Sequence, residues 1–420
     1  MPSTDGEQPT PRLFPALAEP LVRRYFIGQS ISVLGSWIQN ITLNLLCWQL
    51  TGSPALLGVI NFVLFGPSVL VTPIVGPRVQ PGNARRLTLL AVGGSLLVTM
   101  ALVALSASGA ITVALMVGLA LAKGLLGALE GPARQVLLTT AVTDPTRIAN
   151  AVAMNTVAYN AARMIGPAIA AAVFATLGAT AAFAMTALAL AVMLVSVLRL
   201  PIAAGTGIET DAPAQHASLR SAIAYVRNDR LARLFLPVST CLALLGSSYQ
   251  TLVPVLADHV YGSANTWTGL FFAAAGAGST AAALLLSSRF LFAASRRLQV
   301  VTPWTVVVAL AGLGTTGTPA IAMLCFAVLG FSLTFTGPGT NAKLQQNAPP
   351  GLRGALVGLY AMSFTGAIPL GNLMIGTLAQ WLPVQGSFLA MAGLLAVLLA
   401  IMFVPRWIAR GRIVIDADEI

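Results

Sequence analysis

The stretch NTVAYNAARMIGPAIAA, residues 155–171, decides how the chain is built. It is apolar except for a few positions, and Asn155, Tyr159 and Arg163 recur in it every four residues. Residues four apart lie on one face of a helix, so these three form a polar stripe. In a helix that crosses a bilayer, Arg163 would lie deep in hydrocarbon, where an unpaired charge is costly. We therefore expect Arg163 to face a partner or a water-filled cavity, with this helix as a wall of a substrate path.

The composition indicates a protein that crosses a membrane many times. Hydrophobic residues make up 57% of the chain and charged residues only 8%, whereas a soluble domain carries about 25% charged residues. The net charge is +11, but the basic residues lie in short runs between apolar segments, which is the pattern of topology signals. We therefore expect a lipid bilayer, and no nucleic acid, as a partner.

The residues that enzymes use are sparse and scattered. Cys47, Cys241 and Cys325 lie far apart in apolar segments, and His216 and His259 have no ligand-like neighbours. None of these spacings fits a metal site, a disulfide framework or a catalytic triad. The sequence therefore predicts no metal, no cofactor and no catalytic residue, and it excludes an enzyme.

Membrane-spanning helices need about 20 largely apolar residues, and the chain offers twelve such runs. The predicted spans are Tyr25–Leu50, Ala55–Val75, Leu87–Ala107, Ile111–Leu129, Asn150–Leu177, Ala179–Leu200, Leu231–Leu256, Trp267–Phe290, Gln299–Thr316, Pro319–Thr340, Ala355–Leu378 and Gly386–Phe403.

The basic residues predict the orientation of these spans. Lys and Arg follow the even-numbered spans and flank both termini, whereas the connections Thr51–Pro54, Ser108–Ala110 and Thr315–Thr318 carry none. Cytosolic loops are enriched in Lys and Arg. We therefore expect both termini in the cytosol, with residues 1–22 as a tail and not a cleaved signal.

The two halves of the chain repeat. Gly131 and Arg147 are sixteen residues apart, as are Gly337 and Arg353, and other features recur at offsets of 206 to 211 residues. This predicts an all-α protein of two pseudo-symmetric six-helix bundles, an arrangement common among transporters. The predicted division is a tail at 1–22, bundles at 23–200 and 231–405, a linker at 201–230 and a tail at 406–420. In the linker, residues 218–228 predict a short amphipathic helix at the membrane surface. A monomer is expected, because twelve helices form a self-sufficient unit.

Several stretches carry a resemblance to a known family, from about residue 23 to residue 406. They are GQSISVLGSWIQ (28–39), LTGSPALLG (50–58), GPARQVLL (131–138), ARMIGPAIAA (162–171), LVPVLADHVYG (252–262) and GPGTNAKLQQNAPPGLRGALVGLYAMSFTGAIPLGNL (337–373). The chain resembles major facilitator superfamily exporters, in the branch of the enterobactin exporter and related efflux permeases. This resemblance implies the major facilitator fold, alternating-access export and a bacterial inner membrane.

Two motifs of that family bear on gating. Gly166 and Pro167 are similar to the helix-5 antiporter motif, which in the family is associated with export and packs the two bundles on the extracellular side. After the second span the family expects an acidic residue, where this chain has Gln80. A gate latch that uses this carboxylate is therefore absent or made differently.

Polar residues within the spans are the candidates for substrate binding. Gln29, Ser32, Ser36, Asn40 and Asn44 form one face of the first span. Each could also act as interhelical glue, but the length of this face favours a cavity. The predicted substrate-binding residues are Arg163, Tyr159, Asn155, Lys123, Asn40, Asn44, Trp37, Gln29, Gln250 and Tyr360. For Arg163, a structural role at the bundle interface is the alternative.

Candidates for coupling and gating are Glu130, Asp258, Gly166, Pro167 and Arg353. Glu130 could pair with Lys123, but we favour pairing with Arg134 one turn on, near the cytosolic surface. For Asp258 and His259, a solvated loop is the favoured interpretation.

These features predict a secondary transporter that exports small amphiphilic molecules, siderophore-like or drug-like, as a proton antiporter. Lys123 and Arg163 favour anionic or multiply hydroxylated solutes over lipophilic cations. The alternatives are a broad multidrug pump, a lipid or uptake transporter, and a membrane sensor that transports nothing.

Overall fold

The computed structural model describes residues 15–201, 219–287 and 295–408, which are helical throughout apart from short connections. The described part of the first half holds η1 (Pro15–Ala18), α1 (Pro20–Thr51), α2 (Pro54–Val75), α3 (Pro81–Ala107), α4 (Val113–Ala141) and α5 (Ile148–Leu198). The second half holds α6 (Leu219–Asn228), α7 (Ala232–Cys241), α8 (Tyr249–His259), α9 (Ala264–Ser287), α11 (Ser295–Thr315), α12 (Pro319–Asn347), α13 (Arg353–Tyr360), α14 (Gly366–Leu378) and α15 (Val384–Ile408).

Ten helical stretches among the described residues are long and apolar enough to cross a membrane. One of them is α5, which holds two consecutive helices that meet at Gly178, where φ is 80° and ψ is 177°. Only glycine adopts this backbone conformation readily. Helix α1 is not among the ten, since its polar face lowers its hydropathy. Counting α1 and both parts of α5, the twelve predicted spans are present, and the predicted boundary at Gly178 is confirmed.

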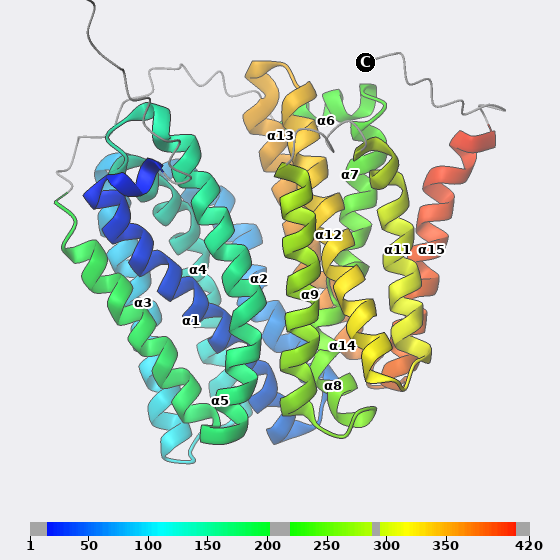
Figure 1. Cartoon of the computed structure of the whole chain (residues 1–420), viewed down its shortest axis with the longest axis horizontal. Helices are drawn as coiled ribbons and strands as arrows, with labels where there is room; N and C mark the ends of the chain where they lie inside the picture. Colours follow the sequence, from blue (N-terminus) through cyan, green and yellow to red (C-terminus); the bar gives the residue numbers. More distant parts are fainter. Residues whose placement is uncertain (1–14, 202–218, 288–294, 409–420) are drawn as a thin grey trace, which may run out of the picture.

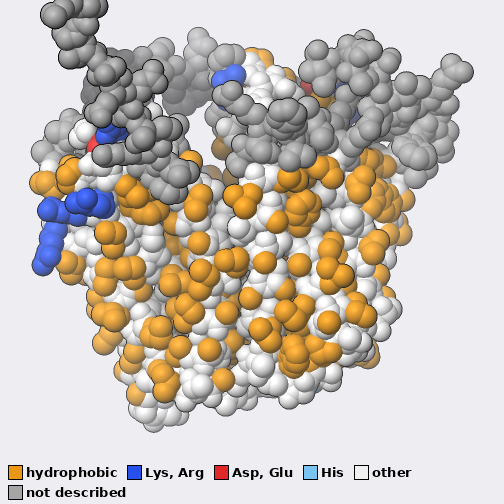
Figure 2. Space-filling view, in the orientation of Figure 1, with side chains coloured by type: hydrophobic (Ala, Val, Ile, Leu, Met, Phe, Trp, Pro, Cys, Tyr) orange, Lys and Arg blue, Asp and Glu red, His pale blue; other side chains and the backbone are white. Residues whose placement is uncertain are grey.

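The two halves stand side by side, and Figure 1 shows the start of α1, the end of α15 and the short helix α6 at one end of the molecule. We call this the terminal end. The opposite end, formed by connections such as 51–53 and 260–263, is the distal end. On the face that Figure 2 shows, the flank carries hydrophobic and uncharged atoms, with Lys and Arg only near the terminal end. This is the surface expected of a protein embedded in a bilayer.

Small residues let the two halves approach closely, along α5 and α9 on one side and α2 and α14 on the other. A Cβ added at Gly276 of α9 would lie 2.6 Å from the Met164 Cβ, and one at Gly58 of α2 would lie 2.7 Å from the Asn372 carbonyl oxygen. Such contacts are typical of membrane helices, where packing replaces the hydrophobic effect. Gly166 itself packs within the first half, because a Cβ there would lie 2.6 Å from the Trp37 Cβ. Its neighbours, not Gly166, make the contact with α9.

The halves are joined at the distal end. Hydrogen bonds at this end run from Trp48 to Asp258, from Asn61 to Thr251 and from Gln380 to Ser53. Thr280 also contacts the Met164 sulfur, and Tyr249 contacts Arg163 across the halves. Towards the terminal end α5 is open, since Val157 is 61% and Tyr159 51% exposed. The described residues therefore show a conformation that is closed at the distal end.

Several helix ends and interruptions differ from the prediction. Helix α4 continues twelve residues beyond Leu129, through Pro132, and α12 continues to Asn347. Proline is tolerated in a membrane helix because its neighbours satisfy the freed carbonyl groups. Two predicted spans are interrupted by π-helical turns, at Leu242–Gly246 between α7 and α8 and at Ala361–Thr365 between α13 and α14. The expected linker helix is present as α6.

The segment that leads into each bundle contacts the end of the fourth span or the connection after it. In the first half, Glu19 accepts hydrogen bonds from the Thr143 backbone N–H and hydroxyl, at 2.7 and 2.8 Å, and lies 3.6 Å from Arg147. In the second half, the Tyr225 hydroxyl of α6 donates to the Asn347 carbonyl oxygen at 3.1 Å. Glu19 and Tyr225 are 206 residues apart, the offset of the sequence repeat. The duplication thus includes the segments that lead into the bundles.

Candidate functional site

Three charged side chains on α4 form the centre of the candidate site. Lys123, Glu130 and Arg134 are spaced seven and four residues apart, so they lie on one face of the helix. The Glu130 carboxylate is 2.5 Å from the Arg134 guanidinium and 3.9 Å from the Lys123 ammonium group, and it accepts a hydrogen bond from Ser95 of α3 at 3.3 Å. All three charged residues are less than 9% exposed. We call them the α4 charge cluster.

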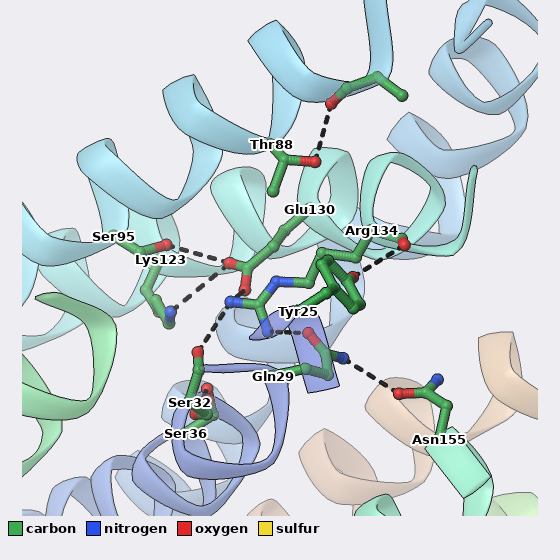
Figure 3. A network of polar contacts seen from close by, with 11 residues as sticks. Tyr25, Gln29, Ser32, Ser36, Thr88, Ser95, Lys123, Glu130, Arg134 and Asn155 are labelled. Atoms are coloured by element: carbon green, nitrogen blue, oxygen red, sulfur yellow. Dashed lines mark hydrogen bonds and ion pairs between the residues drawn. The ribbon is translucent and has the colours of Figure 1, made fainter. Parts of the chain in front are cut away.

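The α4 charge cluster continues into α1 and α5 (Figure 3). Arg134 donates to the Gln29 side-chain oxygen and to the Ser32 hydroxyl, both at 2.8 Å. Gln29 in turn donates to the Asn155 side chain of α5 at 3.3 Å, and the Tyr25 hydroxyl donates to the Arg134 carbonyl oxygen at 2.9 Å. A chain of polar contacts therefore connects the interior of the first half with the polar stripe on α5.

The cluster holds two positive charges and one negative charge, all removed from water. Taking charges out of water costs several kcal/mol per ion unless pairing and hydrogen bonds compensate. Glu130 is the one described carboxylate that pairs with both Lys123 and Arg134. Removing the carboxylate would leave two buried cations without a counter-charge, which makes Glu130 essential to the arrangement.

Arg163 is the second feature of the site. Its guanidinium carbon lies 5.8 Å from the centre of the Trp37 ring, within range of a cation–π interaction. Across the boundary between the halves, the Tyr249 hydroxyl of α8 faces the Arg163 and Gln250 side chains. Among the described residues no carboxylate lies within ion-pair distance of Arg163. Arg163 therefore brings an uncompensated positive charge to the interface of the halves.

A layer of amides and an indole joins the two halves at the distal end. Asn61 donates to the Asn44 side chain at 2.7 Å and to the Thr251 hydroxyl at 3.4 Å. Nearer the distal end, the Trp48 indole donates to the Asp258 carboxylate at 2.9 Å, and its ring meets His259 edge-on with centroids 5.3 Å apart. We call these residues the distal gate. Since it joins α1 and α2 to α8, it must open for a solute to leave at this end.

The structure brings together some of the predicted residues. Gln29, Asn155, Lys123 and Glu130 share one network, and Trp37 and Gln250 lie near Arg163. Tyr159 is half exposed on α5, and the Asn40 carbonyl oxygen accepts a hydrogen bond from Asn44, which belongs to the distal gate. Their roles in binding stay predictions.

Other predicted residues lie elsewhere. Tyr360 stacks on Phe364 in the second half, with ring centroids 5.3 Å apart. Arg353 is at the terminal end, where it donates to the Ala348 carbonyl oxygen at 3.3 Å. Pro167 contacts α9, where its carbonyl oxygen lies 3.5 Å from a Cβ added at Gly269.

Two interpretations of acidic residues require correction. Glu130 pairs with Arg134 as favoured, but it also pairs with Lys123, and it is buried because α4 does not end at Leu129. Asp258 is not part of a solvated loop, since it accepts the Trp48 hydrogen bond across the halves.

The prediction also missed Arg134 as a member of the site. Its spacing from Glu130 was visible in the sequence, but the supposed end of the helix placed it at the surface. The Asn61 and Thr251 contacts of the distal gate were missed as well, because they join residues 190 positions apart.

The chain thus combines two bundles of membrane-spanning helices, a buried network of charged and polar side chains and a closed distal gate, which together define a membrane transporter. The chain belongs to the transmembrane secretion effector family, whose model matches residues 13–410. It is similar to the staphyloferrin A transporter of Staphylococcus aureus (strain NCTC 8325 / PS 47), with 27% identity over 369 residues, which are 87% of this chain and 91% of that protein.

Solved structures confirm the major facilitator fold. A bacterial homologue of the human lysosomal transporter Spinster, in an inward-facing and unoccupied conformation, superposes with a TM-score of 0.73 at 12% identity, over 92% of this chain and 97% of that one. The nucleoside transporter NupG superposes with a TM-score of 0.70 at 15% identity, over 92% and 98% of the two chains. The family and these relatives are transporters and not enzymes, as the sequence predicts.

Proposed function

We propose that this transporter exports small anionic amphiphiles of the siderophore type by alternating access. The observation that carries the proposal is Arg163, a cation at the boundary between the halves that no described carboxylate neutralises. A charged residue inside a membrane protein marks a substrate path by default. An anionic group of the solute supplies the missing counter-charge, while Tyr249 and Trp37 offer a hydroxyl and a ring beside it.

Two observations support export as the direction of transport. The matching family is described as a transmembrane secretion effector family, and α5 carries the Gly-Pro pair of the helix-5 antiporter motif. The siderophore in the name of the Staphylococcus aureus relative supports the class of solute.

The proposed setting is a bacterial cytoplasmic membrane, with the terminal end in the cytosol and the chain as a monomer. Arg23, Arg78, Arg147 and Arg220 lie near the terminal end, whereas the described distal connections carry no Lys or Arg. This distribution follows the positive-inside rule.

For the energy source, the hypothesis drawn from the sequence is proton antiport, with Glu130 or Asp258 as the acid that carries the proton. A carrier of this kind must release and rebind a proton in its working pH range. A pH gradient imposed on proteoliposomes at zero membrane potential tests this hypothesis, because proton antiport predicts solute movement under that gradient alone.

A broad multidrug pump is the second candidate. The second half contains parallel aromatic pairs, Tyr360 with Phe364 and Phe331 with Phe335. Aromatic rings bind apolar and cationic drugs without needing a particular arrangement of hydrogen bonds.

Thermal unfolding of the detergent-purified protein with a panel of solutes distinguishes the two candidates. Ligand at roughly 100 times its Kd adds about 2.7 kcal/mol to the free energy of unfolding. We expect stabilisation by catecholate and carboxylate siderophores, lost in Arg163→Ala and retained in Arg86→Ala, an exposed arginine at the terminal end. Stabilisation by lipophilic cations alone would contradict anion export and support the multidrug pump.

A further inference from the structure

The acids within the membrane are few enough to be accounted for one by one. The sequence has twelve Asp and Glu residues. By sequence position, ten of them lie in the tails, the linker and the terminal connections. Only Glu130 of α4 and Asp258 of α8 lie within spanning helices.

Glu130 is poorly suited to exchange a proton during transport. The titratable groups around it are Lys123 and Arg134 of α4, Tyr25 of α1 and Tyr159 of α5, and Ser95 of α3 bonds its second oxygen. A proton on Glu130 would leave two buried cations without a counter-charge, which strongly opposes protonation.

Asp258 is separated from the open side of the molecule. The Asn44, Asn61 and Thr251 contacts lie between it and Arg163, and its carboxylate accepts the Trp48 hydrogen bond. In this closed conformation, the described residues offer no route for a proton from Asp258 to the terminal end. Neither acid therefore sits where a cytosolic solute would meet it.

The positive charge of Arg163, in contrast, lies at the boundary between the halves, and no described carboxylate pairs with it. In the observed conformation the distal gate separates Arg163 from the outside, so most of a transmembrane voltage falls across the gate. When the gate opens and the terminal end closes, the same charge comes to lie on the outer side of the voltage drop.

In place of the proton antiport that the sequence suggests, we propose that the membrane potential, acting on the positive charge of Arg163, drives the cycle. This inference rests on the proposed export of anions and names its driving force. An inside-negative potential pulls the empty, positively charged carrier back to the conformation that is open at the terminal end. A bound anion neutralises the site, so the loaded carrier turns outward against little electrical resistance. For each negative charge on the exported solute, every ~59 mV of potential supports a tenfold ratio of outside to inside solute concentration.

The test follows the empty carrier and needs no ligand. Ser53 and Gln380 are hydrogen-bonded across the halves at 3.4 Å beside the distal gate. In a variant whose native cysteines are replaced by alanine, Ser53→Cys with Gln380→Cys should cross-link when the distal end is closed. Right-side-out membrane vesicles are set to a range of potassium diffusion potentials with valinomycin, at equal pH on both sides.

We expect the ratio of open to closed distal gates to fall as the interior becomes more negative. The change is up to tenfold per ~59 mV for each elementary charge that crosses the whole voltage. Arg163→Gln should remove most of the slope of its logarithm, because it removes the charge that crosses the voltage. Arg86→Gln, an exposed charge at the terminal end, should leave the slope unchanged.

A cross-linking yield that ignores the potential would overturn the inference, and so would a yield that follows a pH gradient at clamped potential. These outcomes are independent of the solute panel. If no anion stabilises the protein but the potential dependence is present, export of anions fails and the electrical response stands.

Discussion

Replacing Glu130 by glutamine should be among the most destabilising single changes in the transporter. The side chain keeps its size, but Lys123 and Arg134 lose the carboxylate that lies 3.9 and 2.5 Å away. Removing one partner of a buried ion pair costs about 3–5 kcal/mol, mainly because the remaining charge stays buried. We place Glu130→Gln within that range, since two charges are left and both are less than 9% exposed.

The double variant Glu130→Gln with Lys123→Met identifies the cause. It removes one of the two uncompensated charges and fills the space with an unbranched apolar chain, so it should recover a substantial part of the loss. Gln135→Ala, at an exposed position of the same helix, is the control and should behave like the parent.

The measurement is unfolding in mixed micelles of detergent and SDS, followed by tryptophan fluorescence and ranked against the parent. Two results would refute the reasoning. One is Glu130→Gln with unfolding indistinguishable from the parent. The other is a double variant that is less stable than Glu130→Gln alone, which would mean that Lys123 contributes by packing and not by charge.

Three further changes probe other parts of the structure. Gly330→Ala should lower the free energy of unfolding by about 1–3 kcal/mol, because the added Cβ would overlap a backbone carbonyl of α9. Gly393→Ala, where the added Cβ meets open space, should not. Thermal unfolding compares the two variants. Trp48→Phe removes the hydrogen bond to Asp258. The ratio of closed to open distal gates, measured by distal cross-linking, should therefore fall by about tenfold or more, as expected for a bond of about 1.5–3 kcal/mol to a charged group. The pKa of Asp144 is lowered, chiefly by hydrogen bonds from the threonine two residues on. The contribution of the Asp144 carboxylate to the free energy of unfolding should therefore be present at neutral pH and disappear as the pH falls through this lowered pKa. In Asp144→Ala, the free energy of unfolding should decrease less steeply at acid pH.

The sequence was sufficient for the number and order of the spans, for physical reasons that particular residues illustrate. Apolar runs of about 20 residues have few alternatives to a membrane helix, and Gly178 marked a boundary that regular helix geometry could not cross. The helix ends were less certain. Pro132 resembles a helix stop in soluble proteins, yet α4 continues through it, and this error moved Arg134 from the interior to the surface.

The site could be predicted only where its residues are close in sequence. Lys123, Glu130 and Arg134 lie on one helix, so their spacing alone aligns them. The distal gate joins Trp48 to Asp258 across 210 positions, and no local pattern encodes such a contact. The π-helical turns could not be predicted for a similar reason. Such a turn holds one residue more than an α-helical turn, so it changes the direction of every side chain beyond it without changing the local composition.

The unequal distribution of charge between the duplicated halves has a consequence for engineering. The first half holds Lys123, Glu130, Arg134 and Arg163, whereas the described spans of the second half hold charged residues only near their ends. Substitutions in the second half can therefore reshape the pocket wall while the electrical balance stays constant. Variant libraries confined to helices α12 to α14 offer a way to change which ring systems are transported, while the first half continues to determine the charge of the solute.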